Sequence, residues 1–357
     1  MSDQNRSAES PPPPQEFGDA TPARGFGALV LRRFLRNRMA MVSLFLVLLL
    51  WLGTVVAIGL GPLPGLWKHD YSTLYPQHAG GRATLSLLPV WLGGEGIGLG
   101  EHPFGQSRIG QDYFAMTMRG IQNSVFVMVV IGGAGTVVGT VIGAIAGYYR
   151  GWVDAVLMRM TDVFIVIPTL VIGAVVGRTA GGLGIWFLAV LLALISWMPV
   201  ARLVRAEFLS LREREFVEAA RVGGAGNARI IAVHILPNAV GVVIVSGTLL
   251  AASAILLETA LSYLGYGVQP PEVSLGRLIS DNQSAFATRP WLYWWPAVFI
   301  VGLALLVNFV GDGLRNAFDP RQHRFRLRRT PGTRGGGRAS SRAAAPPATE
   351  PENRSER

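Results

Sequence analysis

Long uncharged apolar runs, separated by charged segments, constrain the fold of this chain more than any other feature of its sequence. The first run, Met39 to Leu60, holds 22 residues without a charge. A helix of about 20 apolar residues crosses the hydrocarbon core of a bilayer. The sequence therefore predicts an all-α integral membrane protein with six transmembrane helices, at residues 39–60, 121–149, 158–176, 183–200, 239–264 and 291–310.

Arginine-rich segments between the runs predict the orientation of the chain. They lie before the first run, between the fourth and fifth runs, and after the sixth, which places both termini in the cytoplasm by the positive-inside rule. The first run is too long for a signal peptide, so we expect it to be retained. The expected organisation is a disordered cytoplasmic tail (1–23), a basic flank with the first helix (24–60), an extracytoplasmic segment (61–120), a five-helix core (121–320) with a cytoplasmic loop (202–237), and a disordered basic cytoplasmic tail (321–357).

The segment from Arg205 to Asn238 is a charged island between two apolar runs. Arg214 and Glu218 stand four residues apart, and Arg221 follows three residues after Glu218, so both pairs favour a helix. Glycines at 223, 224 and 226 are expected to end that helix. The island is therefore expected to contain one charged helix closed by a glycine-rich turn.

One face of this expected helix is built mostly from small residues. By the helical period, Phe216, Ala219, Ala220 and Gly223 fall on the same side. Small side chains let another surface approach the helix backbone closely. Two interpretations follow from the pattern: a solvated helix that only links two spans, or a docking helix for a soluble partner.

Four glycines in the second run, Gly135, Gly139, Gly143 and Gly147, follow one another at intervals of four residues. Glycine at this spacing forms a groove along one helix face, into which a second helix packs closely. This pattern predicts helix packing and not a substrate site.

Polar residues inside the expected spans are candidates for a translocation pathway, because a buried charge in a membrane needs a partner or water. Asp162 lies about one turn from Arg159, so an ion pair at the interface is the alternative to a pathway role. Glu258 and Asn308 are the other two candidates.

Several classes of chemistry are excluded or disfavoured by the residues present. The chain has no cysteine, and its only lysine, Lys68, does not follow the glycine loop of an ATP-binding P-loop. The five histidines have no metal-ligand spacing, and no metal is expected. The net charge of +10 comes from arginines that flank apolar runs, which indicates membrane orientation and not nucleic-acid binding. Energy from ATP must then come from a partner.

The charged island resembles the EAA signature of ABC-importer permeases. The matching residues are Glu218-Ala219-Ala220, then Gly224 after three residues, and His234-Ile235-Leu236-Pro237 after nine more. Gly223 departs from the pattern, since relatives more often carry a bulkier apolar residue there. The block from Leu256 to Pro271 is similar to one in dipeptide and oligopeptide permeases, and the block from Asn308 to Pro320 resembles the closing block of that family.

The stretch from His102 to Asp112 resembles the segment that precedes the second span in peptide-permease relatives. It departs from their pattern at Gln111, where arginine is usual, and at Ser107, where an acidic residue is usual.

The resemblance implies a type I ABC-importer permease fold and a C-type subunit in the cytoplasmic membrane. It implies a second permease subunit, two ATP-binding subunits and an extracytoplasmic substrate-binding protein as partners, with ATP and magnesium held by the ATPases and no cofactor in this chain. A helix at about 208–224 would dock on the ATPase. Its implied coupling residues are Glu218, Ala219, Ala220, Gly224, Leu236 and Pro237, supported by Arg214, Phe216 and Arg221. Pro237 is expected to start the fifth span sharply.

The same resemblance implies import of dipeptides or oligopeptides by alternating access. The wider group also carries nickel chelates, some sugars and opines, and the sequence does not choose among them. Two other classes stay open: an ion- or proton-coupled secondary transporter, and a membrane scaffold without transport activity.

Overall fold

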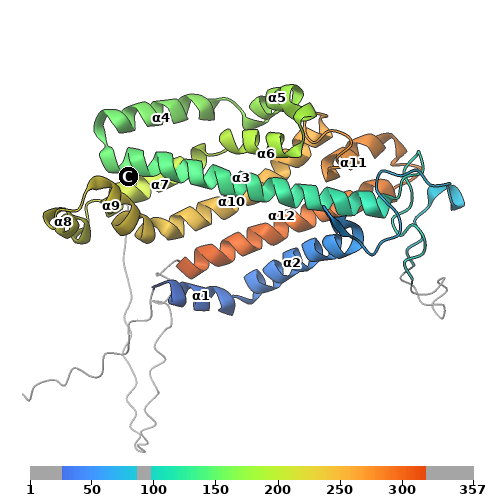
Figure 1. The fold of residues 1–357 in the computed structure, drawn as a ribbon, viewed down its shortest axis with the longest axis horizontal. Coiled ribbons are helices and arrows are strands. Elements are labelled where there is room, and N and C mark those ends of the chain that lie inside the picture. Colours follow the sequence, from blue (N-terminus) through green and yellow to red (C-terminus); the bar gives the residue numbers. More distant parts are fainter. Residues whose placement is uncertain (1–25, 87–97, 319–357) are drawn as a thin grey trace, which may run out of the picture. The chain divides into compact units, whose positions relative to one another are not determined.

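The computed structural model describes residues 26–86 and 98–318. The tails predicted at 1–23 and 321–357 lie outside these residues. Long helices run alongside one another through the described part of the chain (Figure 1): α2 (Arg38–Ile58), α3 (Tyr113–Tyr149), α10 (Leu236–Tyr263) and α12 (Trp291–Phe318). The α7 helix (Met198–Leu211) packs along α3, and α2 packs along α12. Buried apolar side chains between these helices form the core.

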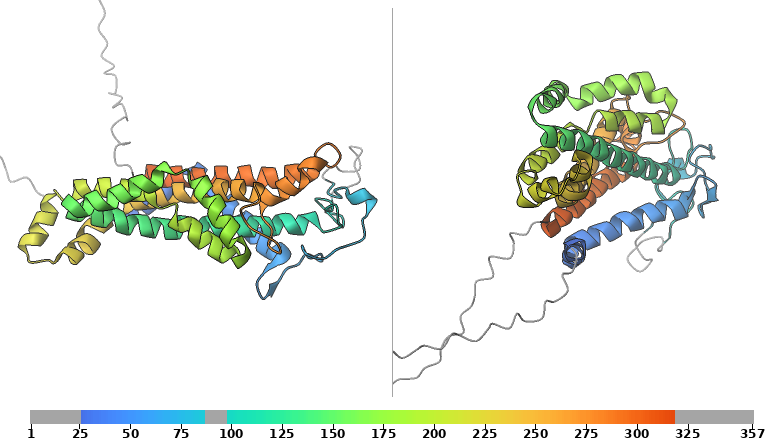
Figure 2. Two further views of the ribbon diagram at one scale, coloured as in Figure 1. Left: turned by 90° about the horizontal axis from the view of Figure 1, so that it is seen from above. Right: turned by 60° about the vertical axis from the view of Figure 1, so that its left-hand side comes forward.

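The other described elements are shorter. They are α1 (Phe26–Arg36), β1 (Gly59–Leu60), β2 (Leu63–Pro64), η1 (Ala79–Gly81), α4 (Gly151–Val166), α5 (Thr169–Ala180), η3 (Gly181–Leu183), α6 (Ile185–Leu194), α8 (Glu215–Val222), α9 (Asn227–Arg229), the π-helix η4 (Ile230–Ile235), α11 (Leu275–Asn282) and η5 (Gln283–Ala285). In Figures 1 and 2, α1 and α2 lie on the side of the bundle away from α4 and α5.

The bundle has two distinct ends. One end, called here the α8 end, comprises residues 212–235 with α8 and α9. The other, called the α11 end, comprises residues 59–86, 98–112 and 264–290. Figure 1 shows these ends on opposite sides of the long helices.

The predicted helical membrane fold is confirmed, but two of the six predicted spans are not single helices. Among the described residues, four helices are long and apolar enough to cross a membrane, and the number rises to six if each of two bent pairs is one span. In the predicted span 158–176, α4 and α5 meet at 80°. Pro168 has no backbone N–H and disfavours a helical residue before it; Ile167 accordingly has extended backbone angles.

The predicted fourth span, 183–200, is the second bent pair. Its two helices, α6 and α7, meet at 42°, and Pro199 lies in the first turn of α7. The α7 helix continues to Leu211, well past the predicted end at Val200. Residues 202–211, which the sequence predicts as the start of the cytoplasmic loop, extend the helix instead.

The α3 helix begins at Tyr113, eight residues before the predicted start of its span at Ile121. Asp112 caps it, because one carboxylate oxygen accepts a hydrogen bond of 2.7 Å from the Ala115 N–H. The other oxygen lies 2.6 Å from Nδ1 of buried His102. Trp67 Nε1 donates to the capping oxygen at 3.3 Å. The segment before α3 is thus fixed to the start of the helix.

Pro237 lies in the first turn of α10, as predicted, but the span does not begin sharply there. The helix is continuous from Asn227 to Tyr263 and contains the π-helical residues 230–235. The Leu236 N–H donates to the Ile231 carbonyl, five residues back. Proline lacks an N–H and its ring excludes the carbonyl four residues before it. The wider π turn accommodates that ring without ending the helix.

Candidate functional site

The α8 helix is a short element at the tip of the α8 end (Figure 1). It spans the eight residues Glu215–Val222 and is separate from α7, so the single docking helix predicted at about 208–224 is wrong in its extent. Val217 is fully buried and anchors α8 to the core, whereas Val222 is 90% exposed. The helix is therefore attached by one face and presents the other.

Most of the predicted coupling residues lie on the exposed side of this segment. Glu218, Ala219 and Gly224 are exposed, and so are the predicted support residues Arg214, Phe216 and Arg221. Ala220 and Leu236 are half-buried and pack against the core, while Pro237 is exposed. The predicted face of small residues is therefore not exposed as a whole: Ala219 faces out, whereas Ala220 packs against the core.

The predicted ion pairs of Glu218 are not present among the described residues. Arg214 is the N-cap of α8 and has extended backbone angles, so it is not part of the helical face that carries Glu218. The acidic side chain that forms ion pairs here is Glu213, at 2.9 Å from Arg150 and 3.7 Å from Arg212. Glu218 is left on the exposed surface.

Gly224 closes α8 in a left-handed conformation, with φ of +79°. The Gly224 N–H donates to the Arg221 carbonyl, and the Ala225 N–H donates to the Ala220 carbonyl, both at 3.0 Å. Such a turn favours glycine because other residues are strained at positive φ. No atom of the described chain lies within 4 Å of a β-carbon built at Gly224.

Both flanks of α8 are tied to the end of α3. Arg212, before α8, donates a hydrogen bond to the Tyr148 carbonyl and lies over the Tyr148 ring at 5.9 Å. The Tyr148 hydroxyl donates to Asn227, after α8, at 2.8 Å. Sequence reasoning assigned no such role to these three residues, because their contacts join positions 64 and 79 residues apart. A movement of α8 would thus be transmitted to α3 as well as to α7.

The four regularly spaced glycines of α3 are all buried. A β-carbon built at Gly139 would lie 2.8 Å from the Trp197 carbonyl, and one at Gly147 would lie 2.8 Å from the Arg205 carbonyl. At Gly143 the nearest atom is the Ala201 carbonyl, and at Gly135 it is a methyl group of Leu250. The glycines therefore line the contact of α3 with α7, and at Gly135 with α10.

Asp162 forms an ion pair with Arg202 of α7, and not with Arg159, the partner that the alternative interpretation named. The pair joins α4 to α7, and each side chain is close to half exposed. The Asn308 amide donates to the Ala304 carbonyl of its own helix at 2.9 Å. Asp162 and Asn308 therefore each bond to a partner other than the remaining pathway candidates.

Glu258, the third pathway candidate, is enclosed within the described part of the chain. It is 1% exposed. Its carboxylate accepts hydrogen bonds from the hydroxyls of Ser262 at 2.7 Å, Ser274 at 2.6 Å and Ser124 at 3.2 Å. The Ser262 oxygen in turn accepts from the Val268 N–H at 3.1 Å. This cluster fastens the loop after α10 to α10 and α3.

Replacing Glu258 with leucine is expected to destabilise the α11 end. The change leaves three buried hydroxyls without their acceptor, and each such loss costs about 1–3 kcal/mol. Glu258→Gln keeps one acceptor oxygen and should lose less. Melting temperature in detergent and protease cleavage between residues 264 and 274 measure the effect. A leucine variant as stable as the glutamine variant would contradict this role.

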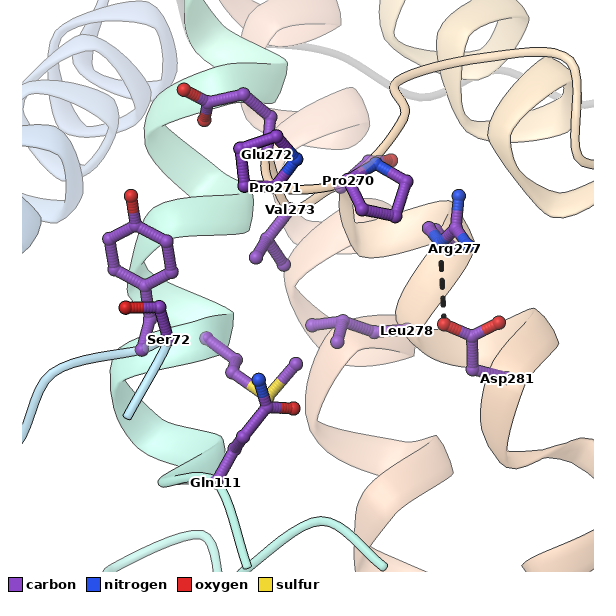
Figure 3. Close-up of a pocket in the computed structure, with 12 residues that line it drawn as sticks. Ser72, Gln111, Pro270, Pro271, Glu272, Val273, Arg277, Leu278 and Asp281 are labelled. Atoms are coloured by element: carbon purple, nitrogen blue, oxygen red, sulfur yellow. Dashed lines mark ion pairs between the residues drawn. The ribbon is translucent and has the colours of Figure 1, made fainter. Parts of the chain in front are cut away.

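A cavity of about 340 Å³ lies at the α11 end (Figure 3). The segment before α3 and the first turn of α3 form one side, and the loop after α10 with α11 forms the other. The lining residues are Tyr71, Ser72, Gln111, Met116, Pro270, Pro271, Glu272, Val273, Ser274, Arg277, Leu278 and Asp281.

The charged groups beside this cavity are already paired. Burial alone would raise the pKa of Glu272, but hydrogen bonds from Arg119 at 2.9 and 3.1 Å and from Asn123 at 2.9 Å hold that pKa below its usual value. Arg277 lies 3.4 Å from Asp281, an ion pair drawn in Figure 3, and donates to Gln269 at 3.0 Å.

This geometry defines a class of protein: a multi-pass helical membrane protein with a short, exposed helix between its fourth and fifth spans. A family described as binding-protein-dependent transport system inner membrane component matches residues 139–324. A second, described as the N-terminal TM domain of oligopeptide transport permease C, matches residues 25–89.

Relatives align over most of the chain. The oligopeptide transport system permease protein OppC of Mycobacterium tuberculosis is 40% identical over 299 residues, which are 84% of this chain and 96% of the relative. The protein of the same name from Escherichia coli is 36% identical over 290 residues, 81% of this chain and 89% of the relative. A structure of the MetNI methionine ABC transporter covers 57% of this chain with a TM-score of 0.48 and 19% identity.

The chain belongs to the family of binding-protein-dependent transport system inner membrane components. It is a multi-pass protein of the cytoplasmic membrane and a permease subunit of an ABC transporter.

Proposed function

We propose that this chain is one of two permease subunits of an ABC importer that carries dipeptides or oligopeptides into the cell. Its relatives are named oligopeptide permeases, and the alignment with them covers most of both chains. An extracytoplasmic binding protein delivers the peptide at the α11 end, and two ATPase subunits bind at the α8 end. ATP and magnesium are held by the ATPases, and this chain performs no hydrolysis itself.

The arrangement of α8 is the observation that carries this proposal. Val217 fixes one face of the helix in the core, while Ala219, Val222 and Gly224 are left exposed at the tip of the bundle. The helix continues through short connections into α7 on one side and α9 and α10 on the other. A rigid body that grips α8 would therefore move both of those spans together, which is what alternating access requires.

The alternative hypothesis, an ion-coupled secondary transporter, is disfavoured by the surroundings of two carboxylates within the described spans. Such a transporter needs ionisable groups that face the path. Asp162 is paired with Arg202, and Glu258 is enclosed by three serines. Neither is placed to bind a passing ion.

The proposal is tested by uptake of a labelled tripeptide into vesicles that contain the complete complex. Uptake should require ATP and the binding protein, and it should persist when ionophores remove all ion gradients. Uptake that stops with the gradients while ATP remains would instead identify a secondary transporter. A complex that purifies without any ATPase and moves no peptide would identify a scaffold.

A further inference from the structure

The cavity at the α11 end carries polar groups that no described residue satisfies. The Tyr71 hydroxyl and the Gln111 side-chain amide line it, and neither forms a hydrogen bond within residues 26–86 and 98–318. In Figure 3 the amide of Gln111 is directed into the cavity. An amide offers both a donor and an acceptor, as a peptide bond does, and a phenolic hydroxyl also serves as both. These two groups therefore suit an uncharged ligand that both donates and accepts hydrogen bonds.

The opposite wall has an apolar part that does not fix one particular ligand shape. Pro270, Pro271, Val273 and Leu278 form it, and Met116 lies beside Gln111. Methionine adapts to ligands of different shape because its side chain is flexible and polarisable. Such a wall accepts side chains of several sizes.

Charge plays little part in what the cavity selects. Glu272 is satisfied by Arg119 and Asn123, and Arg277 is neutralised by Asp281 and Gln269. A free anion or cation would have to compete with these partners. The guanidinium of Arg119 also lies over the Tyr71 ring at 5.5 Å, which occupies one aromatic face that a sugar ring would use for stacking.

We propose that this cavity binds a short extended stretch of the transported peptide through its main chain, with Gln111 and the Tyr71 hydroxyl as the recognising groups. The volume of about 340 Å³ lies within the usual range of small-ligand pockets, about 300–1,000 Å³. This inference rests on the proposed function, because it takes the α11 end to be the entrance. It assigns sequence-independent recognition to one site on this subunit.

The first experiment measures peptide uptake by the complete complex at a fixed, subsaturating concentration of loaded binding protein. Loss of one uncharged hydrogen bond costs about 1 kcal/mol, so Tyr71→Phe should lower uptake about fivefold. Gln111→Leu removes a donor and an acceptor and should lower it about tenfold or more. The matched control is Gln77→Leu, since Gln77 lies in the same segment but outside the cavity and bonds to the Arg108 carbonyl.

A modified substrate separates recognition from a structural effect. N-methylation of the peptide removes main-chain donors, so it should lower uptake by the wild-type complex but have little further effect in Gln111→Leu. Equal uptake by wild type and Gln111→Leu would overturn the proposal. So would an equal loss in Gln77→Leu, or equal discrimination against the methylated peptide in both complexes.

A second experiment identifies the source of the bound polypeptide. The chain has no cysteine, so Gln111→Cys introduces a thiol that is unique within this subunit, and labelling is read on this subunit's band. A bromoacetylated tripeptide should label it, and excess unmodified tripeptide should protect it, with or without ATP. Protection by the empty binding protein alone, or no protection by peptide, would overturn the proposal. Absence of ATP-dependent uptake in the wild-type complex, with peptide protection intact, would count against the proposed function and not against this site.

Discussion

Gly143→Leu is expected to yield no folded protein, and Gly143→Ala to lower the melting temperature in detergent by several degrees. A β-carbon at Gly143 would lie 2.5 Å from the Ala201 carbonyl and 3.0 Å from the Arg205 nitrogen. Both are backbone atoms of α7, so the two helices must separate to admit even a methyl group. Overpacking of this kind costs about 1–3 kcal/mol for a small addition and more for a large one.

A second glycine of the same helix supplies the control for this prediction. Gly133 is exposed, and nothing lies within 4 Å of a β-carbon built there. Gly133→Ala should leave the melting temperature unchanged or raise it slightly, because alanine is the better helix former. Equal melting temperatures for Gly143→Ala and Gly133→Ala would show that the α3–α7 contact tolerates a side chain. They would thereby contradict close packing along this face.

Spacing in the sequence was enough to identify the glycine face of α3 as a packing surface, because periodicity is a local property of one helix. The partner was not predictable in the same way. Helices α3 and α7 are separated by α4, α5 and α6 along the chain, and only the folded arrangement brings Ala201 next to Gly143.

The bends in the third and fourth spans could not be predicted from hydropathy. Both predicted spans are predominantly apolar, so a hydropathy pattern alone treats each as one straight helix. Pro168 and Pro199 were the available signals, since proline removes a helical hydrogen bond and restricts the residue before it. The angles of 80° and 42° depend on packing that the pattern does not contain.

Glu258 illustrates a different limit of sequence reasoning. A carboxylate in an apolar run indicates either a pathway or an internal partner, and the two look alike in sequence. Its partners are hydroxyls of Ser124, Ser262 and Ser274, of which only Ser262 lies one helical turn away. Serines are common in apolar runs, so none of the three stood out as a ligand of the carboxylate.

The segment from Arg205 to Asn238 contains the predicted charged helix and glycine-rich turn, but its internal contacts differ from those predicted. Its exposed glycines and alanines lie where the motif placed them, yet the ion pairs expected for Glu218 are replaced by those of Glu213. The break between α7 and α8 at residues 212–214 leaves Arg214 as the extended N-cap of α8 and not as a residue within the helix.

Val222→Asp is expected to abolish stable association with the ATPase and to lower peptide uptake about thirtyfold or more. Val222 is 90% exposed at the end of α8, so the chain itself gains little from this apolar side chain. In the proposed complex it is covered by the ATPase, where a central apolar contact contributes about 2 kcal/mol or more. An aspartate there would also be buried without a partner.

The fold of the permease should survive this change, because substitutions at exposed positions usually alter stability by about 0.5 kcal/mol or less. Leu66→Asp is the control, since Leu66 is 85% exposed at the opposite, α11 end. It should retain both the ATPase and its melting temperature. Copurification of the ATPase with each variant, followed by vesicle uptake, measures the outcome. If the Val222→Asp complex keeps its ATPase and full uptake, the exposed face of α8 is not the contact surface, and movement must reach the spans through another part of the α8 end.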